Sequence, residues 1–144
     1  MTIDASGEYW KGTEAADLKP FLVDYEAGGY PVAEVVPAAC TCGGGRFEVA
    51  LSGDEQAVRR RCVSCGEEKL MLDSAEHWDD EDEDECACPC EGEVFEAAVG
   101  LARREDASIK WVSVGLRCVE CGVLGVYADW KIDYSPSEHL VKQV

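Results

Sequence analysis

The chain has 144 residues, with 30 acidic and 13 Lys or Arg residues, and its formal net charge at pH 7 is −17. A surface of this sign repels phosphate backbones on average, which argues against a general nucleic-acid binder. The apolar stretches are far shorter than the ~20 residues that a membrane helix needs, and the first residues carry no export signal. We therefore expect a cytoplasmic protein that does not span a membrane.

Residues 1–37 form an N-terminal segment before the first cysteine. Short helices are predicted at 13–18 and 20–27, with Pro20 in a first turn where its missing N–H costs nothing. An extended segment follows at 30–37. The apolar side chains of this segment either cover the face of a neighbouring sheet or form a docking face for a partner. They are Tyr9, Trp10, Phe21, Leu22 and Tyr25.

Residues 38–78 contain four closely spaced cysteines. Cys40 and Cys42 are separated by one residue, and Cys62 and Cys65 belong to a Cys-x-x-Cys-Gly turn. Two intervening residues let both sulfurs of the later pair reach one ion. Glycine at 43, 44 and 45 allows the positive φ angles that turn backbone N–H groups toward thiolates. Alternating polar and apolar residues predict strands at 46–51, 56–61 and 67–73.

An unbroken run of seven acidic residues at 79–85 follows, and because it repels itself we predict a solvated linker at 79–86. The alternative is an acidic segment that attracts a basic partner. Of the nine cysteines, Cys86 is the one left over, since it has no counterpart in the first group. It either replaces Cys88 or Cys90 as a ligand or is a redox-sensitive thiol, and carboxylate neighbours disfavour the second role by raising a thiol's pKa.

Residues 87–134 repeat the cysteine pattern with a longer hairpin. Phe95 follows Cys90 at the spacing at which Phe47 follows Cys42, which sets the alignment of the two repeats. Polar residues at 135–144 predict a frayed tail. The strands of the second repeat are predicted at 94–101, 109–117 and 123–130.

The two repeats resemble the zinc-ribbon class, in which two cysteine turns hold one zinc ion beneath a three-stranded sheet. The resemblance implies a mainly β fold of two tandem three-stranded antiparallel zinc ribbons, each with one structural Zn²⁺, and a binding role. Disulfides are the alternative for a small Cys-rich chain, but they belong to exported proteins. The predicted ligands are Cys40, Cys42, Cys62 and Cys65 in one site and Cys88, Cys90, Cys118 and Cys121 in the other.

Four cysteine ligands close the coordination sphere, whereas a catalytic zinc keeps a position for water. His77 and His139 lie outside the ligand pattern, and we recognise no phosphate loop and no Ser/His/Asp set. We therefore predict no catalytic residue. The favoured function is a non-enzymatic adaptor or regulator that binds another protein, and the acidic charge favours a basic partner.

Direct binding of RNA or DNA is the alternative function, and an accessory subunit of an enzyme is another. Trp111 and Tyr127 would stack on bases beside the basic residues of the two repeats. Those basic residues would otherwise compensate the anionic metal sites and pair with glutamates on neighbouring strands, such as Glu48, Glu67 and Glu68. The basic residues are Arg46, Arg59, Arg60, Arg61 and Lys69, and Arg103, Arg104, Lys110 and Arg117.

Overall fold

The computed structural model describes residues 10–25, 30–52, 57–72, 74, 78–79, 81, 83–106, 108–132, 140–141 and 144. Within these residues the chain forms one sheet of eight antiparallel strands and one short α-helix, α1 (Leu18–Tyr25), preceded by the 3₁₀ turn η1 (Ala15–Asp17). The predicted mainly β fold is thereby confirmed. No helix in this part of the chain has the length and apolar character needed to cross a membrane.

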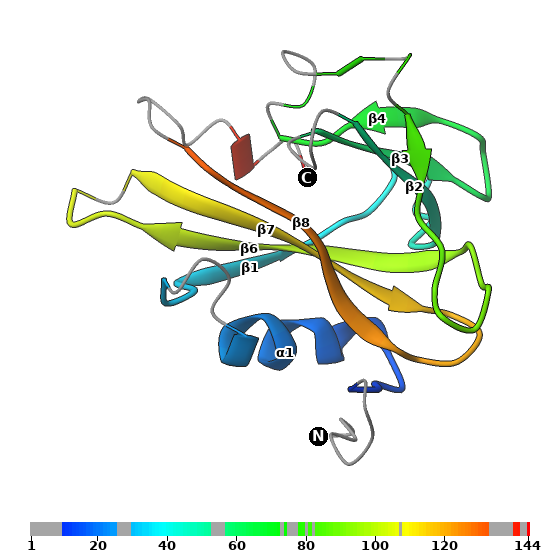
Figure 1. Cartoon of the computed structure of the whole chain (residues 1–144), viewed down its shortest axis with the longest axis horizontal. Helices are drawn as coiled ribbons and strands as arrows, with labels where there is room; N and C mark the ends of the chain where they lie inside the picture. Colours follow the sequence, from blue (N-terminus) through cyan, green and yellow to red (C-terminus); the bar gives the residue numbers. More distant parts are fainter. Residues whose placement is uncertain are drawn as a thin grey trace.

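The eight strands pair in the order β4-β3-β2-β6-β7-β8, while β1 pairs with β6 and β5 pairs with β2 (Figure 1). Strands β2 to β4 come from the first cysteine repeat and β6 to β8 from the second, close to the predicted ranges. The strands are β1 (Glu34–Pro37), β2 (Phe47–Ser52), β3 (Ala57–Cys62), β4 (Glu68–Leu70), β5 (Asp84–Glu85), β6 (Phe95–Arg103), β7 (Ile109–Cys118) and β8 (Leu124–Lys131).

The two repeats join in a two-fold-like arrangement. Phe47 of β2 pairs with Phe95 of β6, so equivalent positions of the two repeats lie opposite each other in antiparallel strands. The strand that precedes each cysteine group pairs with the other repeat, because β1 pairs with β6 and β5 with β2. Each repeat therefore contributes a strand to the other repeat's hairpin, and the two predicted ribbons share one sheet.

The acidic run is more than the solvated linker predicted from its charge. Asp84 and Glu85 form β5 and lie opposite Leu51 and Ala50 of β2. Both acidic side chains of β5 stay exposed, so the backbone pairs with β2 while the charges keep their water. Arg59 of β3 forms an ion pair with Glu83 and offsets part of the negative charge.

The N-terminal helix covers one face of the sheet. Figure 1 shows α1 lying against the strands of the second repeat, and its buried residues Leu18, Phe21 and Leu22 pack with Ala98 and Leu124. The predicted role of covering a sheet face is therefore confirmed for Phe21 and Leu22, whereas Tyr25 is 55% exposed. Tyr9 lies outside the described residues.

The opposite face of the sheet holds the main core, to which both repeats contribute. The end of the chain also packs there, since Leu140 and Val144 are buried and the carbonyl of Val144 accepts a hydrogen bond from Arg60 Nε at 2.9 Å. The prediction of a frayed tail is therefore wrong at these two positions, because their side chains are apolar although the surrounding tail is polar. His139 and His77 lie outside the described residues.

Candidate metal centres

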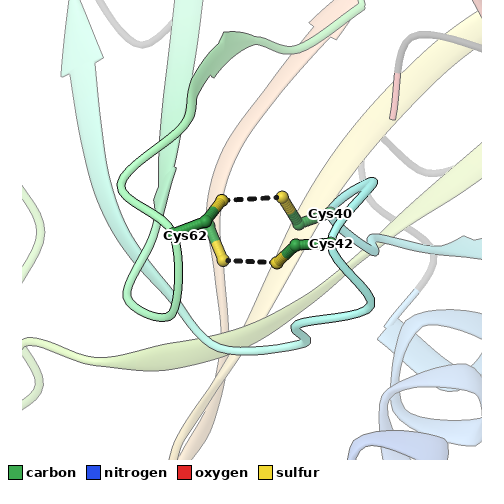
Figure 2. Close-up of side chains that lie close together, drawn as sticks. Cys40, Cys42 and Cys62 are labelled. Carbon is green, nitrogen blue, oxygen red and sulfur yellow. Dashed lines mark hydrogen bonds between the residues drawn. The ribbon is translucent and has the colours of Figure 1, made fainter.

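The four cysteines of the first repeat meet at one end of the β2–β3 hairpin, and we call them tetrad 1. Cys40 Sγ lies 3.4 Å from Cys65 Sγ, and Cys42 Sγ lies 3.6 Å from Cys62 Sγ. Figure 2 shows Cys40 and Cys42 on one side of the site, facing Cys62 on the other. All four sulfurs lie within 4.8 Å of one another. Zinc bound to four thiolates separates the sulfurs by about 3.8 Å, so the tetrad has nearly the dimensions of such a site.

Tetrad 2 comprises Cys88, Cys90, Cys118 and Cys121, and its dimensions match those of tetrad 1. The sulfurs of Cys88 and Cys121 are 3.4 Å apart, and those of Cys90 and Cys118 are 3.6 Å apart. These distances far exceed the ~2.05 Å of a disulfide bond. Each tetrad can thus hold a metal ion, and the two are compatible with two structural zinc sites.

The cysteine turns are held by equivalent backbone hydrogen bonds. The N–H of Gly66 donates to the carbonyl of Cys62, and the N–H of Gly122 donates to the carbonyl of Cys118, both at 2.8 Å. Both glycines have positive φ angles, of 79° and 81°. A left-handed conformation is costly for residues with a Cβ, which explains why glycine follows each Cys-x-x-Cys pair.

Glu91 adopts φ of 75° at the position where the first repeat has Gly43, whose φ is 90°. A non-glycine residue in this region carries roughly 1 kcal/mol of conformational cost. We expect Glu91→Gly to raise the free energy of unfolding by up to about 1 kcal/mol, because relief of this strain outweighs the greater freedom of glycine in the unfolded chain. Urea unfolding of the metal-loaded protein measures the change. A free energy of unfolding equal to or lower than that of the unmodified protein would contradict the expectation. The control is Glu120→Gly, which makes the same substitution in the neighbouring turn.

Two further glycines leave room for the sulfurs. A Cβ at Gly44 would lie 2.9 Å from Cys62 Sγ, and a Cβ at Gly92 would lie 2.9 Å from Cys118 Sγ. A side chain at either position would therefore force neighbouring atoms, including a ligand sulfur, to shift. Gly92 was not predicted from the sequence, although it occupies the position equivalent to Gly44 in the aligned repeats.

The pKa values of two thiols in tetrad 1 are shifted in opposite directions. Backbone N–H groups, above all that of Cys65, lower the pKa of Cys62 to about 6 despite its burial. Although the Glu67 N–H opposes the change, the sulfurs of Cys40 and Cys42 raise the pKa of Cys65 to about 12. Four thiols this close cannot all ionise together without a counter-charge. A divalent cation supplies that charge, so the donor set fits a metal that is bound with release of protons.

The arginine that precedes each Cys-x-x-Cys pair forms an equivalent ion pair. Arg61 Nη2 lies 2.8 Å from Glu48 Oε1, and Arg117 pairs with Glu96. Each pair joins residues directly opposite each other on neighbouring strands. Cross-strand pairing, one of the two roles predicted for the basic residues, is therefore present. Arg59 and Arg103 are paired as well, with Glu68 at 3.3 Å and Glu34 at 3.0 Å.

The two aromatic residues suggested as base-stacking platforms pack within the protein. The ring of Trp111 lies 5.6 Å from that of Tyr30, and its Nε1 donates to Asp129 at 3.3 Å. The ring of Tyr127 meets Phe95 edge-on at 5.4 Å, and burial is the main cause that raises the pKa of its hydroxyl.

Cys86 lies outside both tetrads. Its side chain is buried, and its N–H donates to the carbonyl of Val49 at 2.8 Å. Ala38, at the equivalent position of the first repeat, is also buried, and its N–H donates a hydrogen bond to the carbonyl of Ala97 at 2.9 Å. Cys88 and Cys90 belong to tetrad 2 themselves, so Cys86 occupies a core position that alanine fills in the other repeat.

Comparison of the chain with known protein families, curated proteins and solved structures finds no match.

Proposed function

We propose that the protein is a non-enzymatic zinc-binding adaptor or regulator that acts by binding another protein, and that this partner is basic. The observation that carries the zinc assignment is the pair of tetrads, each with four sulfurs within 4.8 Å of one another. Four protein ligands leave zinc no position for water or substrate. The metal would therefore hold the fold and not perform chemistry.

Zinc bound to the two tetrads would supply folding free energy to a small protein. Each tetrathiolate centre adds a formal charge of about −2 to a protein whose other charges sum to −17 before the thiols ionise. The metal-loaded protein is therefore strongly acidic, and such a surface attracts a basic partner through long-range steering and complementary contacts.

Direct binding of RNA or DNA is less well supported. Arg59, Arg61, Arg103 and Arg117 each form an ion pair with a glutamate, which lowers the positive charge that they offer to phosphates. Trp111 and Tyr127 pack against other aromatic rings. These contacts favour a protein partner over a nucleic acid.

Affinity capture from lysate in a series of salt concentrations tests the proposal. We expect the metal-loaded protein to retain one or more basic proteins at low salt and to release them as salt rises. The same chain treated with a chelator is the control, because it keeps its charged side chains but loses the bound metal. Capture of no protein beyond this control would overturn the proposal. Capture that disappears after nuclease treatment would favour the nucleic-acid alternative.

A further inference from the structure

A groove with a cavity volume of about 450 Å³ lies between α1 and the start of β8, and we call it the α1–β8 groove. One wall carries three aromatic rings in a row, two of them from α1. Trp10 lies 5.9 Å from Phe21, and Phe21 lies 5.9 Å from Tyr25. Tyr25 is 55% exposed, so this wall presents aromatic surface to the solvent.

The floor of the groove is formed by the first residues of β8, the last strand in the sheet order. The carbonyl of Val123 points toward β7 and accepts a hydrogen bond from the N–H of Cys118. The N–H of Leu124 points away from β7 and donates a hydrogen bond to the carbonyl of Trp10 at 2.7 Å. Backbone groups alternate in direction along a strand. The N–H and carbonyl of Val126 therefore face away from β7 as well, and among the described residues no strand pairs with Val126 on that side.

An aromatic groove beside a strand edge with which no described strand pairs at Val126 is suited to an extended peptide. Such a peptide adds a strand through backbone hydrogen bonds, and alternate side chains enter the neighbouring groove. The contact between Trp10 and Leu124 shows that this edge accepts antiparallel backbone, and the bridge between Lys11 and Val123 has the same direction.

Charge selects the kind of peptide. A second copy of the chain is disfavoured as occupant, because each copy carries −17 and like charges repel. Among the described residues that line the groove, Asp24 alone is charged. Its carboxylate favours a lysine or arginine on the same face of the bound strand as the apolar side chain, two residues away from it.

We propose that the α1–β8 groove binds an extended segment of a basic partner protein. The segment adds a strand to β8 at Val126, places an apolar side chain against Trp10, Phe21 and Tyr25, and places a lysine or arginine beside Asp24. This inference rests on the proposed function, since it names the surface and the partner chemistry of that interaction.

Fluorescein-labelled nonapeptides with a Thr/Val host sequence test the groove directly. One set carries Leu, Phe or Trp at the centre and Lys two residues later, and the matched set carries Glu in place of Lys. We expect saturable anisotropy changes with the metal-loaded protein, and affinity for the Lys set at least about threefold higher, as for an exposed ion pair.

Three variants test the named contacts. Asp24→Lys should reverse the preference in favour of the Glu peptides, and Tyr25→Ala should weaken binding of both sets. Val126→Pro should abolish binding, because proline removes the outward N–H but is tolerated at a strand edge. The control Val63→Ala changes an exposed residue in the turn of tetrad 1 and should bind as the unmodified protein does. Metal content and thermal unfolding verify that each variant is folded.

Absence of peptide binding, or equal binding of both sets by Asp24→Lys and the unmodified protein, would overturn the inference. Binding that appears only after removal of residues 1–9 would overturn it in favour of that segment as occupant. If the protein forms a dimer that Val126→Pro dissociates, the inference is overturned in favour of a second copy as occupant.

The failure of the groove can be distinguished from the failure of the proposed function. If a basic partner captured from lysate is retained equally by Asp24→Lys and Val126→Pro, the groove is wrong while the proposed function stands. If the unmodified protein captures no partner, the proposed function itself fails.

Discussion

Removal of the proposed zinc ions should unfold the whole sheet in one transition. A structural zinc site contributes about 10–16 kcal/mol of binding free energy at neutral pH, whereas a domain of this kind is stable by only about 5–15 kcal/mol in total. A chain deprived of both ions therefore lacks the free energy to stay folded. Circular dichroism during titration with a chelator, together with zinc analysis, measures the loss of structure against the loss of metal.

The single transition follows from the exchange of strands between the repeats. Strand β1 belongs to the chain before tetrad 1 but pairs with β6, and β5 precedes tetrad 2 but pairs with β2. Loss of either tetrad therefore removes support from the other hairpin. We expect Cys118→Ser to lower the zinc content of both tetrads, from about two ions per chain toward none, and Cys62→Ser to do the same.

Cys86→Ala is the matched control, since Cys86 is buried but lies outside both tetrads. We expect this variant to retain about two zinc ions per chain. A Cys118→Ser protein that keeps a full zinc ion in tetrad 1, or a chelator titration with two separate transitions, would contradict the expected cooperativity. It would show instead that the two repeats fold as independent units.

Truncation of the phenylalanines at the junction of the repeats should have the second large effect. Phe47 and Phe95 are both 0% exposed and lie opposite each other where β2 meets β6. Replacing a buried phenylalanine by alanine costs about 3–5 kcal/mol through lost burial and the cavity left behind. Each single variant should therefore lose a large part of the stability of the domain, measured by urea unfolding of the metal-loaded protein.

A double-mutant cycle shows whether the two rings support each other across the junction. The milder Phe→Leu substitutions should keep the proteins folded, and neighbouring residues usually show coupling of about 0.5–3 kcal/mol. We expect measurable coupling between Phe47 and Phe95, and strictly additive losses would contradict it. Val63→Ala, at an exposed position, should change stability by no more than about 0.5 kcal/mol.

The phenylalanines also differ in their surroundings, although they occupy equivalent positions. The guanidinium of Arg60 lies 4.7 Å from the centre of the Phe47 ring, whereas Phe95 meets the ring of Tyr127 at 5.4 Å. The cores around the two tetrads thus differ although the cysteine pattern is repeated. The loss of stability on replacement of Phe47 therefore includes a cation–π contact worth about 0.5–2 kcal/mol. Among the described contacts, Phe95 has no such interaction.

The local features of the protein can be predicted from the order of its residues. The spacing of the cysteines identified the two groups that the structure brings together as tetrads, because a turn of a few residues can present two sulfurs to one point. Alternation of polar and apolar residues located the strands of both hairpins, since successive side chains of a strand point to opposite faces. Both signals depend on neighbours in the chain and can be recognised without knowledge of the fold.

The pairing of strands across the repeats, by contrast, depends on the whole fold. The backbone of β5 pairs with β2 although its two side chains are acidic and exposed, because main-chain hydrogen bonds do not depend on the side chain. Burial of Leu140 and Val144 likewise depends on a core built from distant parts of the chain. That no strand of the described residues pairs with the outer side of Val126 can be seen only when the places of the other strands are known. Such non-local pairings follow from the packing of the whole sheet, and no short stretch of sequence encodes them.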